Sequence, residues 1–524
     1  YKDIVESLKD TTYSQAQITG IEEYFINILG NRGYAFAEVA GNPEIDEESN
    51  EVKLIFSVQP GNRTYTRKIL FTGNNITQDQ VLRREMRQFE GAWTSDNAIE
   101  AGKVRLERLG YFKEVSVETI PVPGTDDQID ISYSVEEETT GSIGGNIGYS
   151  DFGLMLGFNL QEQNFLGSGN TVGIGINKNI YSEMYNISYM NPYATRDGVS
   201  LGYNLYFRET DYGEFNVANY LTNSNGFGAQ FGYPISDITR LGFNITYDKT
   251  DIDVGSLPAR EIYDFVSAEG NIFETLSAQL SWQRVTLNRG LFPTDGASTV
   301  LSFSSTIPGS DLSYYRLNVR QRYYQPLTQN LVFGFQGELG YLNAYGDTEE
   351  TPFFQNFYAG GPRSLRGFES NTLGPRSTDA PCYEFNYAEG TCPNLLDIDG
   401  DGELDTPYYN PYANQTSRYR DAPIGGNIKI EGSLQLIFKL PFIEDQRSLR
   451  SAFFFDFGNV FSDNCKEYQI NCSEPSIDDL RYSYGVGITW ITGFGPMSLA
   501  IAKPTNAGPR ERTEEFQFTV GNVF

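Results

Sequence analysis

The feature that most constrains the fold is a two-residue period that recurs throughout residues 141–524. In the stretch 331–341, large apolar side chains fall mostly on odd positions, while glycine, glutamine and glutamate fall on even positions. Successive side chains of a strand point to opposite faces, so one face of such a strand suits lipid and the other suits water. The same alternation recurs at 201–207, 453–457, 482–490 and 516–520.

This alternation predicts a transmembrane antiparallel β-barrel. No segment of the sequence reaches the ~18 uninterrupted apolar residues of a spanning helix, so the membrane has to be crossed by strands that pair in a closed ring. At about 24 residues per strand and connection, residues 141–524 give about sixteen strands, an even number as in bacterial barrels. A soluble β-sandwich could alternate likewise, but 14% aromatic residues and 53 glycines suit girdled strands and tight turns better.

Composition also excludes some functions. The net charge of −29 argues against nucleic acid as a partner, because binding it requires positive charge to neutralise phosphates. The chain has no histidine for a triad or proton shuttle and no GxxxxGK[ST] phosphate loop. We therefore expect no enzymatic activity and no required cofactor.

Residues 1–138 have a different pattern, in which helices and short strands mix. Residues 33–58 match residues 110–135 at an offset of 77, which indicates an internal repeat. We expect two small α+β domains, 1–62 and 63–138, the first of them truncated at its N-terminus. Apolar spacing predicts helices at 18–29, 77–89 and 98–109.

A segment rich in Pro, Asn, Asp and Tyr, at about 360–421, is too long for an ordinary connection, and such length usually signals function or disorder. Within it, acidic residues and a glycine have much of the spacing of a calcium-binding loop, although Tyr408 stands where the bidentate glutamate is expected. The alternatives are a structural Ca²⁺ site and a solvated turn. The metal-ligating candidates are Asp397, Asp399, Asp401, Glu403 and Asp405.

The four cysteines form two local pairs, Cys382 with Cys392 and Cys465 with Cys472. Both pairs lie in polar, loop-like stretches, which favours two short-range disulfides made in an oxidising compartment. Four free thiols are the alternative. Zinc is disfavoured because the chain has no histidine and neither pair has CxxC spacing.

Several short motifs, in order and spacing, resemble the BamA family of outer-membrane protein assembly factors. They lie at residues 73–74, 81–86, 108–112, 291–296 and 360–362, and in the Leu365-Arg366-Gly367-Phe368 sequence of the long loop. The resemblance implies two POTRA domains in the periplasm, at 1–62 and 63–138, and a sixteen-stranded barrel at 139–524 in the bacterial outer membrane. Its implied function is to fold and insert unfolded outer-membrane β-barrel proteins into the lipid.

The resemblance also implies that the loop folds back into the barrel, where its arginine pairs with inward acidic residues. Here the arginine is Arg366, and Asp456 is the partner that lies in phase with lumen-facing positions. Where the family suggests a second acidic residue, this chain has Gln435, which leaves either a neutral hydrogen bond or a role for Glu431. The alternative is an exposed arginine with an ordinary surface contact.

The first and last barrel strands are predicted at 141–149 and 516–524. The first is rich in glycine and the last is short, so the seam between them should hold few ladder bonds and part more easily than any other strand pair. Together with the resemblance, this predicts a lateral gate that pairs with incoming strands. Its residues are Gly144, Gly145, Ile147 and Gly148 on one side and Phe518, Val520, Gly521 and Phe524 on the other.

In the BamA family the POTRA domains bind accessory lipoproteins. The matching face here is the segment 81–90, with Arg83, Arg84 and Glu85 as candidates, although an ordinary solvent-exposed helix is the alternative. The rival function is a two-partner secretion transporter that exports one soluble partner, which would share the POTRA domains, the sixteen strands and the loop motif. A passive porin would not need the repeated N-terminal domains.

Overall fold

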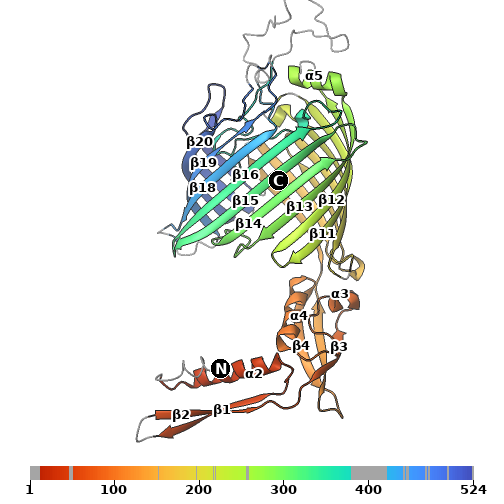
Figure 1. Ribbon diagram of the computed structural model, residues 1–524, viewed down its shortest axis with the longest axis vertical. Coiled ribbons are helices and arrows are strands. Elements are labelled where there is room, and N and C mark those ends of the chain that lie inside the picture. The colour runs from red at the N-terminus through yellow and green to blue at the C-terminus, as the bar shows by residue number, and fades with distance from the viewer. Residues whose placement is uncertain are drawn as a thin grey trace, which may run out of the picture. The chain divides into compact units, whose positions relative to one another are not determined.

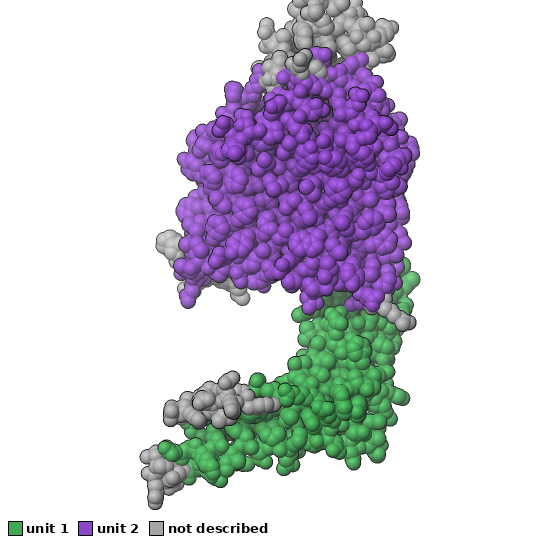
Figure 2. Space-filling view, in the orientation of Figure 1, with its two compact units in different colours: residues 1–141, 162–171 green, residues 142–161, 172–524 purple. Residues whose placement is uncertain are grey.

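The computed structural model describes most of the chain and divides it into two compact units, coloured separately in Figure 2: residues 1–141 with 162–171, and residues 142–161 with 172–524. The described residues are 12–46, 51–150, 153–195, 197–215, 217–218, 220–254, 259–378, 422–440, 443, 448–466, 469, 472–492 and 495–521.

The first unit contains the predicted repeat. Helix α2 (Gln15–Gly30) is followed by the antiparallel strands β1 (Glu38–Asp46) and β2 (Glu51–Gln59). In the second copy, α4 (Asp96–Arg108) is followed by the equivalent pair β4 (Phe112–Pro121) and β5 (Gln128–Glu137). Strand β3 (Tyr65–Thr72) adds in parallel to β5 to complete a sheet of order β3-β5-β4.

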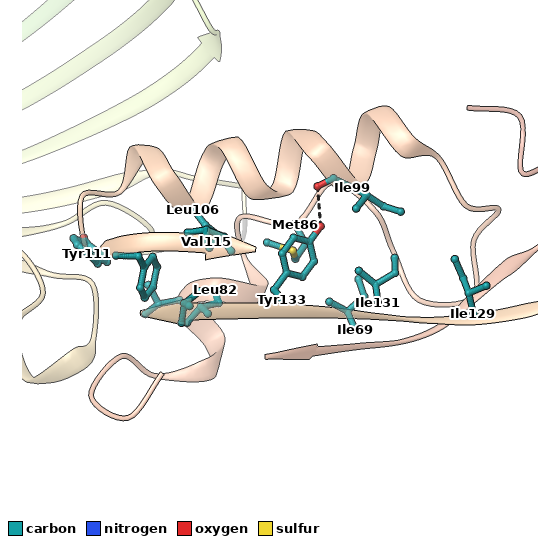
Figure 3. Close-up of a cluster of buried hydrophobic side chains, with 13 residues drawn as sticks. Ile69, Leu82, Met86, Ile99, Leu106, Tyr111, Val115, Ile129, Ile131 and Tyr133 are labelled. Carbon is teal, nitrogen blue, oxygen red and sulfur yellow. Dashed lines mark hydrogen bonds between the residues drawn. The ribbon is translucent and has the colours of Figure 1, made fainter. Parts of the chain in front are cut away.

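A compact apolar core holds the second copy together (Figure 3). Ile129, Ile131 and Tyr133 of β5 are fully buried against Leu82 and Leu106. The Tyr133 hydroxyl donates to the Ile99 carbonyl at 2.8 Å, which satisfies the polar end of this buried ring. The alternation of β5 therefore selects the face that packs under the helices.

The helix predicted at 77–89 is wrong in length, because α3 covers only Asp79–Arg83. Beyond it, Glu85 bonds to Arg105 of α4, and the Gln88 amide bonds to the backbone of Trp93 and Ser95. These tertiary contacts use side chains that periodicity alone assigned to a continuing helix.

The second unit is a closed barrel of sixteen antiparallel strands, as predicted (Figure 1). Its order follows the chain, and the last strand, β23, returns to the first, β6. The strands are β6 (Gly141–Ser150), β7 (Gly153–Glu162), β8 (Thr171–Lys178), β9 (Ser182–Asn191), β10 (Ser200–Asp211), β11 (Leu221–Ser236), β12 (Thr239–Asp253), β13 (Ile272–Val285), β14 (Gly296–Thr306), β15 (Tyr314–Thr328), β16 (Leu331–Ala344), β18 (Ile428–Phe438), β19 (Leu449–Phe461), β20 (Arg481–Thr492), β21 (Gly495–Pro504) and β23 (Phe516–Val520).

The predicted alternation fixes the two faces of the barrel wall. On β19, Phe453 and Phe455 are exposed on the outside, whereas Phe454 and Asp456 between and beside them are buried inside. Such an apolar outer band is what lipid-facing strands require. No helix in the described part of the chain is long and apolar enough to cross a bilayer.

Connections at one end of the barrel carry further structure. They include α5 (Arg260–Glu269), two short 3-10 helices at Gly213–Phe215 and Phe353–Gln355, and two two-residue strands, β17 (Gly367–Phe368) and β22 (Thr513–Glu514), which pair with each other. A third 3-10 helix, Phe165–Gly167, lies in the connection between β7 and β8 and belongs to the first unit. Strand β17 is the second half of the Leu-Arg-Gly-Phe sequence, here called the LRGF turn (Leu365–Phe368). Leu365 and Phe368 are buried in an apolar cluster with Leu342, Phe357 and Val460. This cluster fixes the turn inside the barrel.

Candidate functional site

Arg366 of the LRGF turn forms a two-pronged contact with Asp456 of β19. Its Nε and Nη2 donate to Asp456 Oδ2 and Oδ1, both at 2.7 Å, and the Arg366 backbone N–H adds a longer bond of 3.3 Å. The Asp456 side chain is fully buried, and that of Arg366 is 15% exposed. Such a bidentate pair matches the fork of the guanidinium to the carboxylate, which sets the position as well as the orientation of the turn.

Two neighbours that the sequence did not single out complete the guanidinium's surroundings. Arg366 Nη2 also donates to Ser433 Oγ at 3.0 Å, and the guanidinium carbon lies 3.4 Å from the ring centroid of Phe454. Both residues are in phase with Asp456 or Gln435 on the inner face, so the alternation could have pointed to them. The pair thus lies between an aromatic face and a hydroxyl, where water has little access.

Of the two candidates for the second inward partner of the loop, Gln435 and Glu431, only Glu431 has a hydrogen bond to the described part of the loop. Gln435 does not replace a carboxylate, because its amide donates to Ser433 Oγ at 3.2 Å. Glu431 does contact the loop, through a hydrogen bond from the Ser364 hydroxyl, and it pairs with Lys429 at 3.0 Å. The inner wall therefore holds the LRGF turn through Asp456 and the residue just before the turn, Ser364, through Glu431.

The seam between β6 and β23 is short. Among the described residues these strands share one pair, Val520 with Tyr149. By comparison, β11 pairs with β12 from Leu221–Asp253 to Ser236–Thr239. A ladder of one pair offers few backbone hydrogen bonds to oppose separation.

Gly521 shows why the closing strand ends where it does. Its φ is +81°, and a Cβ there would lie 2.5 Å from the carbonyl oxygen of Ile147, so only glycine fits this bend. The predicted seam residues Gly144, Gly145, Ile147 and Gly148 lie on β6, and Phe518 and Val520 lie on β23. Phe524, also predicted at the seam, lies outside the described residues.

The proposed docking face of the second POTRA copy needs correction. Glu85 is 3% exposed and its carboxylate bonds to Arg105 Nη2 at 2.6 Å, so it is not available to a partner. Arg84 is largely covered as well, because Gly169 of the segment 162–171 packs against it. Arg83 is different: its side chain is 46% exposed and pairs with Asp79 and Glu90. Burial by a distant hairpin cannot be read from local sequence.

That hairpin is tied to the same domain by polar contacts. Asn164 Nδ2 donates to Thr77 Oγ1 at 2.8 Å, and the Gln78 backbone N–H donates to the Gly167 carbonyl at 2.9 Å. Close by, the Glu137 carboxylate accepts three backbone N–H groups, from residues 75–77. Burial raises the pKa of Glu137, but these hydrogen bonds outweigh it, so that the pKa lies below its usual range.

Of the two predicted disulfides, one lies within the described residues. Cys465 and Cys472 form a disulfide in the connection after β19. Cys382, Cys392 and the calcium candidates Asp397, Asp399, Asp401, Glu403 and Asp405 lie outside the described residues. Within the ranges that the structure describes, no group of three or more acidic or cysteine side chains is arranged to hold a metal ion.

Comparison with known proteins gives matches along nearly the whole chain. The family model for the Omp85 superfamily domain matches residues 164–524, and the POTRA model, described as a surface antigen variable number repeat, matches residues 2–61 and 64–138. The outer membrane protein assembly factor BamA of Neisseria meningitidis is 29% identical over 98% of this chain and 63% of its own length. The sorting and assembly machinery component 50 homolog of Mus musculus is 22% identical over 88% of this chain and 89% of its own.

Solved structures agree. The crystal structure of BamA from Haemophilus ducreyi, lacking POTRA domains 1–3, matches with a TM-score of 0.81 and 32% identity, over 97% of this chain and 94% of that one. CdiB from Escherichia coli matches with a TM-score of 0.53 at 13% identity, over 99% of this chain and 86% of that one, which supports the fold alone. The chain spans 63% or less of the length of the BamA relatives from Neisseria meningitidis and Buchnera aphidicola.

Proposed function

This chain belongs to the Omp85 superfamily, and from that premise we propose that it folds and inserts β-barrel proteins into the bacterial outer membrane. Its barrel lies in the outer membrane and its POTRA domains lie in the periplasm. The observation that carries the proposal is the seam, where β6 and β23 share the single described pair Val520–Tyr149 in an otherwise laddered ring.

The proposed mechanism uses the backbone of the seam instead of catalytic side chains. When β6 and β23 part, each presents unpaired N–H and C=O groups, which template a new strand by main-chain hydrogen bonding. An unfolded barrel protein adds its strand at this edge, with its apolar side chains toward lipid. The work is done by hydrogen bonding and apolar burial, so the proposal includes no enzymatic step and no required cofactor.

Depletion of the protein from its bacterium tests this function. We expect a broad loss of many barrel proteins from the outer membrane, measured by quantitative proteomics, because all of them would need the same edge. The rival function, a two-partner secretion transporter, predicts the loss of one secreted protein with the barrel proteins unchanged. That second result would refute the assembly proposal.

We further propose that accessory outer-membrane lipoproteins bind the exposed face around Arg83, where the large apolar side chain of Phe89 is also exposed. Arg83→Glu should lower lipoprotein recovery in a pull-down by about fivefold or more, the effect of losing one important interface side chain. Arg108→Glu, an equivalent charge reversal at the exposed end of α4, is the matched control. Equal lipoprotein recovery with both variants would show that the lipoproteins do not bind around Arg83.

The acidic segment 397–405 remains a proposed calcium site in the long loop, on the basis of its ligand spacing. Calorimetry of the chelator-treated protein should show heat on addition of millimolar calcium, and Asp397→Asn with Asp401→Asn should remove that heat. Absence of heat with the unmodified protein would dismiss the site.

A further inference from the structure

The closing strand has different partners along its length. Just before β23, the two residues of β22 pair with β17, so Gly367 lies opposite Glu514 and Phe368 opposite Thr513. Further along, Val520 pairs with Tyr149 of β6. At β22, just before the closing strand, the backbone partner is therefore the LRGF turn. Among the described residues, the first strand, β6, becomes a partner only at Val520.

Gln517 is the side chain that joins β23 itself to this turn. It is 2% exposed, and its Nε2 donates to the Phe368 carbonyl at 2.7 Å while its Oε1 accepts from the Gly367 N–H at 3.3 Å. These two backbone partners fix the orientation of the amide, because one requires a donor and the other an acceptor. A carboxylate could not donate, and an ammonium could not accept.

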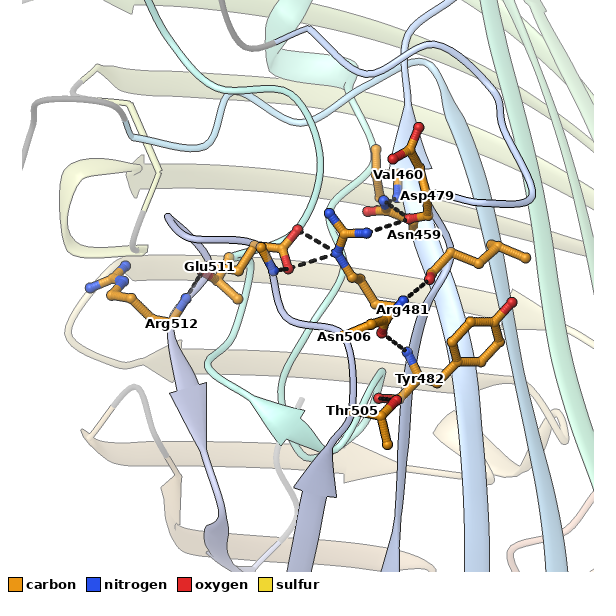
Figure 4. Close-up of polar contacts among 12 residues, drawn as sticks. Asn459, Val460, Asp479, Arg481, Tyr482, Thr505, Asn506, Glu511 and Arg512 are labelled. Atoms are coloured by element: carbon orange, nitrogen blue, oxygen red, sulfur yellow. Dashed lines mark hydrogen bonds and ion pairs between the residues drawn. The ribbon is translucent and has the colours of Figure 1, made fainter.

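The chain leading into Gln517 is anchored to the loop and to β20. The Glu369 N–H donates to the Arg512 carbonyl at 3.0 Å, and the Arg512 N–H donates to Thr372 Oγ1 at 2.9 Å. Figure 4 shows the preceding contacts, in which the Arg481 guanidinium bonds to the Glu511 carboxylate at 2.7 Å. The entry to the closing strand is therefore set by the loop and by β20.

The same turn is also fixed to β19 by Arg366. Arg366 bonds to Asp456 on β19, and one or two residues later Gly367 and Phe368 bond to Gln517 on β23. Adjacent residues of the turn therefore connect β19 to the closing strand β23. A change in how the turn is docked has to change the hydrogen bonds that Gln517 can make.

We propose that Gln517 is a positioning residue that holds the closing strand to the docked LRGF turn and so sets how readily the seam opens. While both hydrogen bonds are made, the start of β23 is fixed and Val520 is kept opposite Tyr149. When the turn moves off Asp456, Gln517 loses both of its bonds to the turn and β23 is freed to leave β6. The role of seam opening in insertion rests on the proposed function. The coupling between Gln517 and the seam does not depend on that function.

A cysteine pair at Tyr149 and Val520 reports on the seam without any substrate. Full-length protein carrying Tyr149→Cys and Val520→Cys is reconstituted in liposomes and oxidised, and peptide mapping separates the new linkage from the native cysteines. Adding Gln517→Glu removes the donor and places a carboxylate against the Phe368 carbonyl. The bond to Phe368 is then lost and two oxygens face each other, so we expect the ratio of open to closed seam to rise about tenfold.

Two further variants keep the test decisive. Gln517→Met loses both hydrogen bonds without adding charge, which covers the case in which the glutamate variant fails to fold. Gln336→Glu makes the same chemical change at another glutamine on the inner wall, which bonds to the Tyr324 hydroxyl, and should leave the seam unchanged. Heat-dependent migration in gels checks that every variant has a folded barrel.

The coupling also predicts non-additivity. Arg366→Ala should open the seam by itself, and should add little in the Gln517→Met background, because both act through one turn. If Gln517→Met cross-links like Gln336→Glu, or if its effect adds fully to that of Arg366→Ala, the coupling is wrong. If the seam responds as expected but insertion does not follow it, the coupling stands and the proposed function fails.

Discussion

Replacing Arg366 with alanine is expected to abolish the insertion of barrel proteins and to lower the thermal stability of the barrel. The change removes both bonds to the fully buried Asp456 and the contact with Phe454. Removing one partner of a buried pair leaves the other charge uncompensated, at a typical cost of ~3–5 kcal/mol. Insertion is measured with an unfolded barrel protein and liposomes containing the variant.

Two companion variants separate geometry from charge. Arg366→Lys keeps the charge but loses the fork, so it should retain only part of the activity. Arg366→Glu combined with Asp456→Arg restores the pair in reverse and should recover some function that each single change loses. Arg363→Ala, at an exposed arginine three residues earlier, is the control and should insert normally. A double variant no better than either single one would show that the contact is not what matters.

Locking the seam should have a comparably large effect. The register places Tyr149 opposite Val520, so Tyr149→Cys with Val520→Cys should form a disulfide, since directly opposed strand residues lie within the span of a disulfide. Because the bond holds β6 and β23 together, insertion into liposomes should fall to the level of protein-free liposomes. A reductant should restore it.

The control for this lock is a cysteine pair in a long ladder. Phe455 and Tyr484 are opposed on β19 and β20 and both face outward, so cross-linking them should leave insertion unchanged. If the protein locked at the seam inserts substrates as fast when oxidised as when reduced, lateral opening is not part of the mechanism.

Much of the site was predictable because the barrel is built on a period of two. Asp456 could be assigned to the inner wall from Phe453, Phe455 and Phe457 around it, and the LRGF resemblance supplied its partner. The resemblance singled out Gln435 as the second inward position, but it could not say that Ser433, two residues away, would be the side chain that receives Arg366. The two-residue alternation predicts which face of the sheet a residue lies on, but it does not predict how far that residue is from a loop.

The error at Glu85 has the same origin. Apolar spacing around residues 77–89 described a helix with an exposed side. The helix instead ends at Arg83, Glu85 bonds to Arg105 of α4, and the segment 162–171 packs against Arg84. Apolar spacing reflects only residues that are close together in the sequence. Burial by a segment about eighty residues away depends on how the domain packs.

By itself the sequence determined the class of fold, the sixteen strands, the two repeated domains and the face on which each strand residue lies, because all of these follow from short-range periodicity and repetition. Only the tertiary structure decided that the seam retains one described pair and that Gln517 bonds to a turn 149 residues away in the chain. Those contacts arise when the ring closes and the loop enters it. Closure brings together residues whose local sequences contain no information about each other.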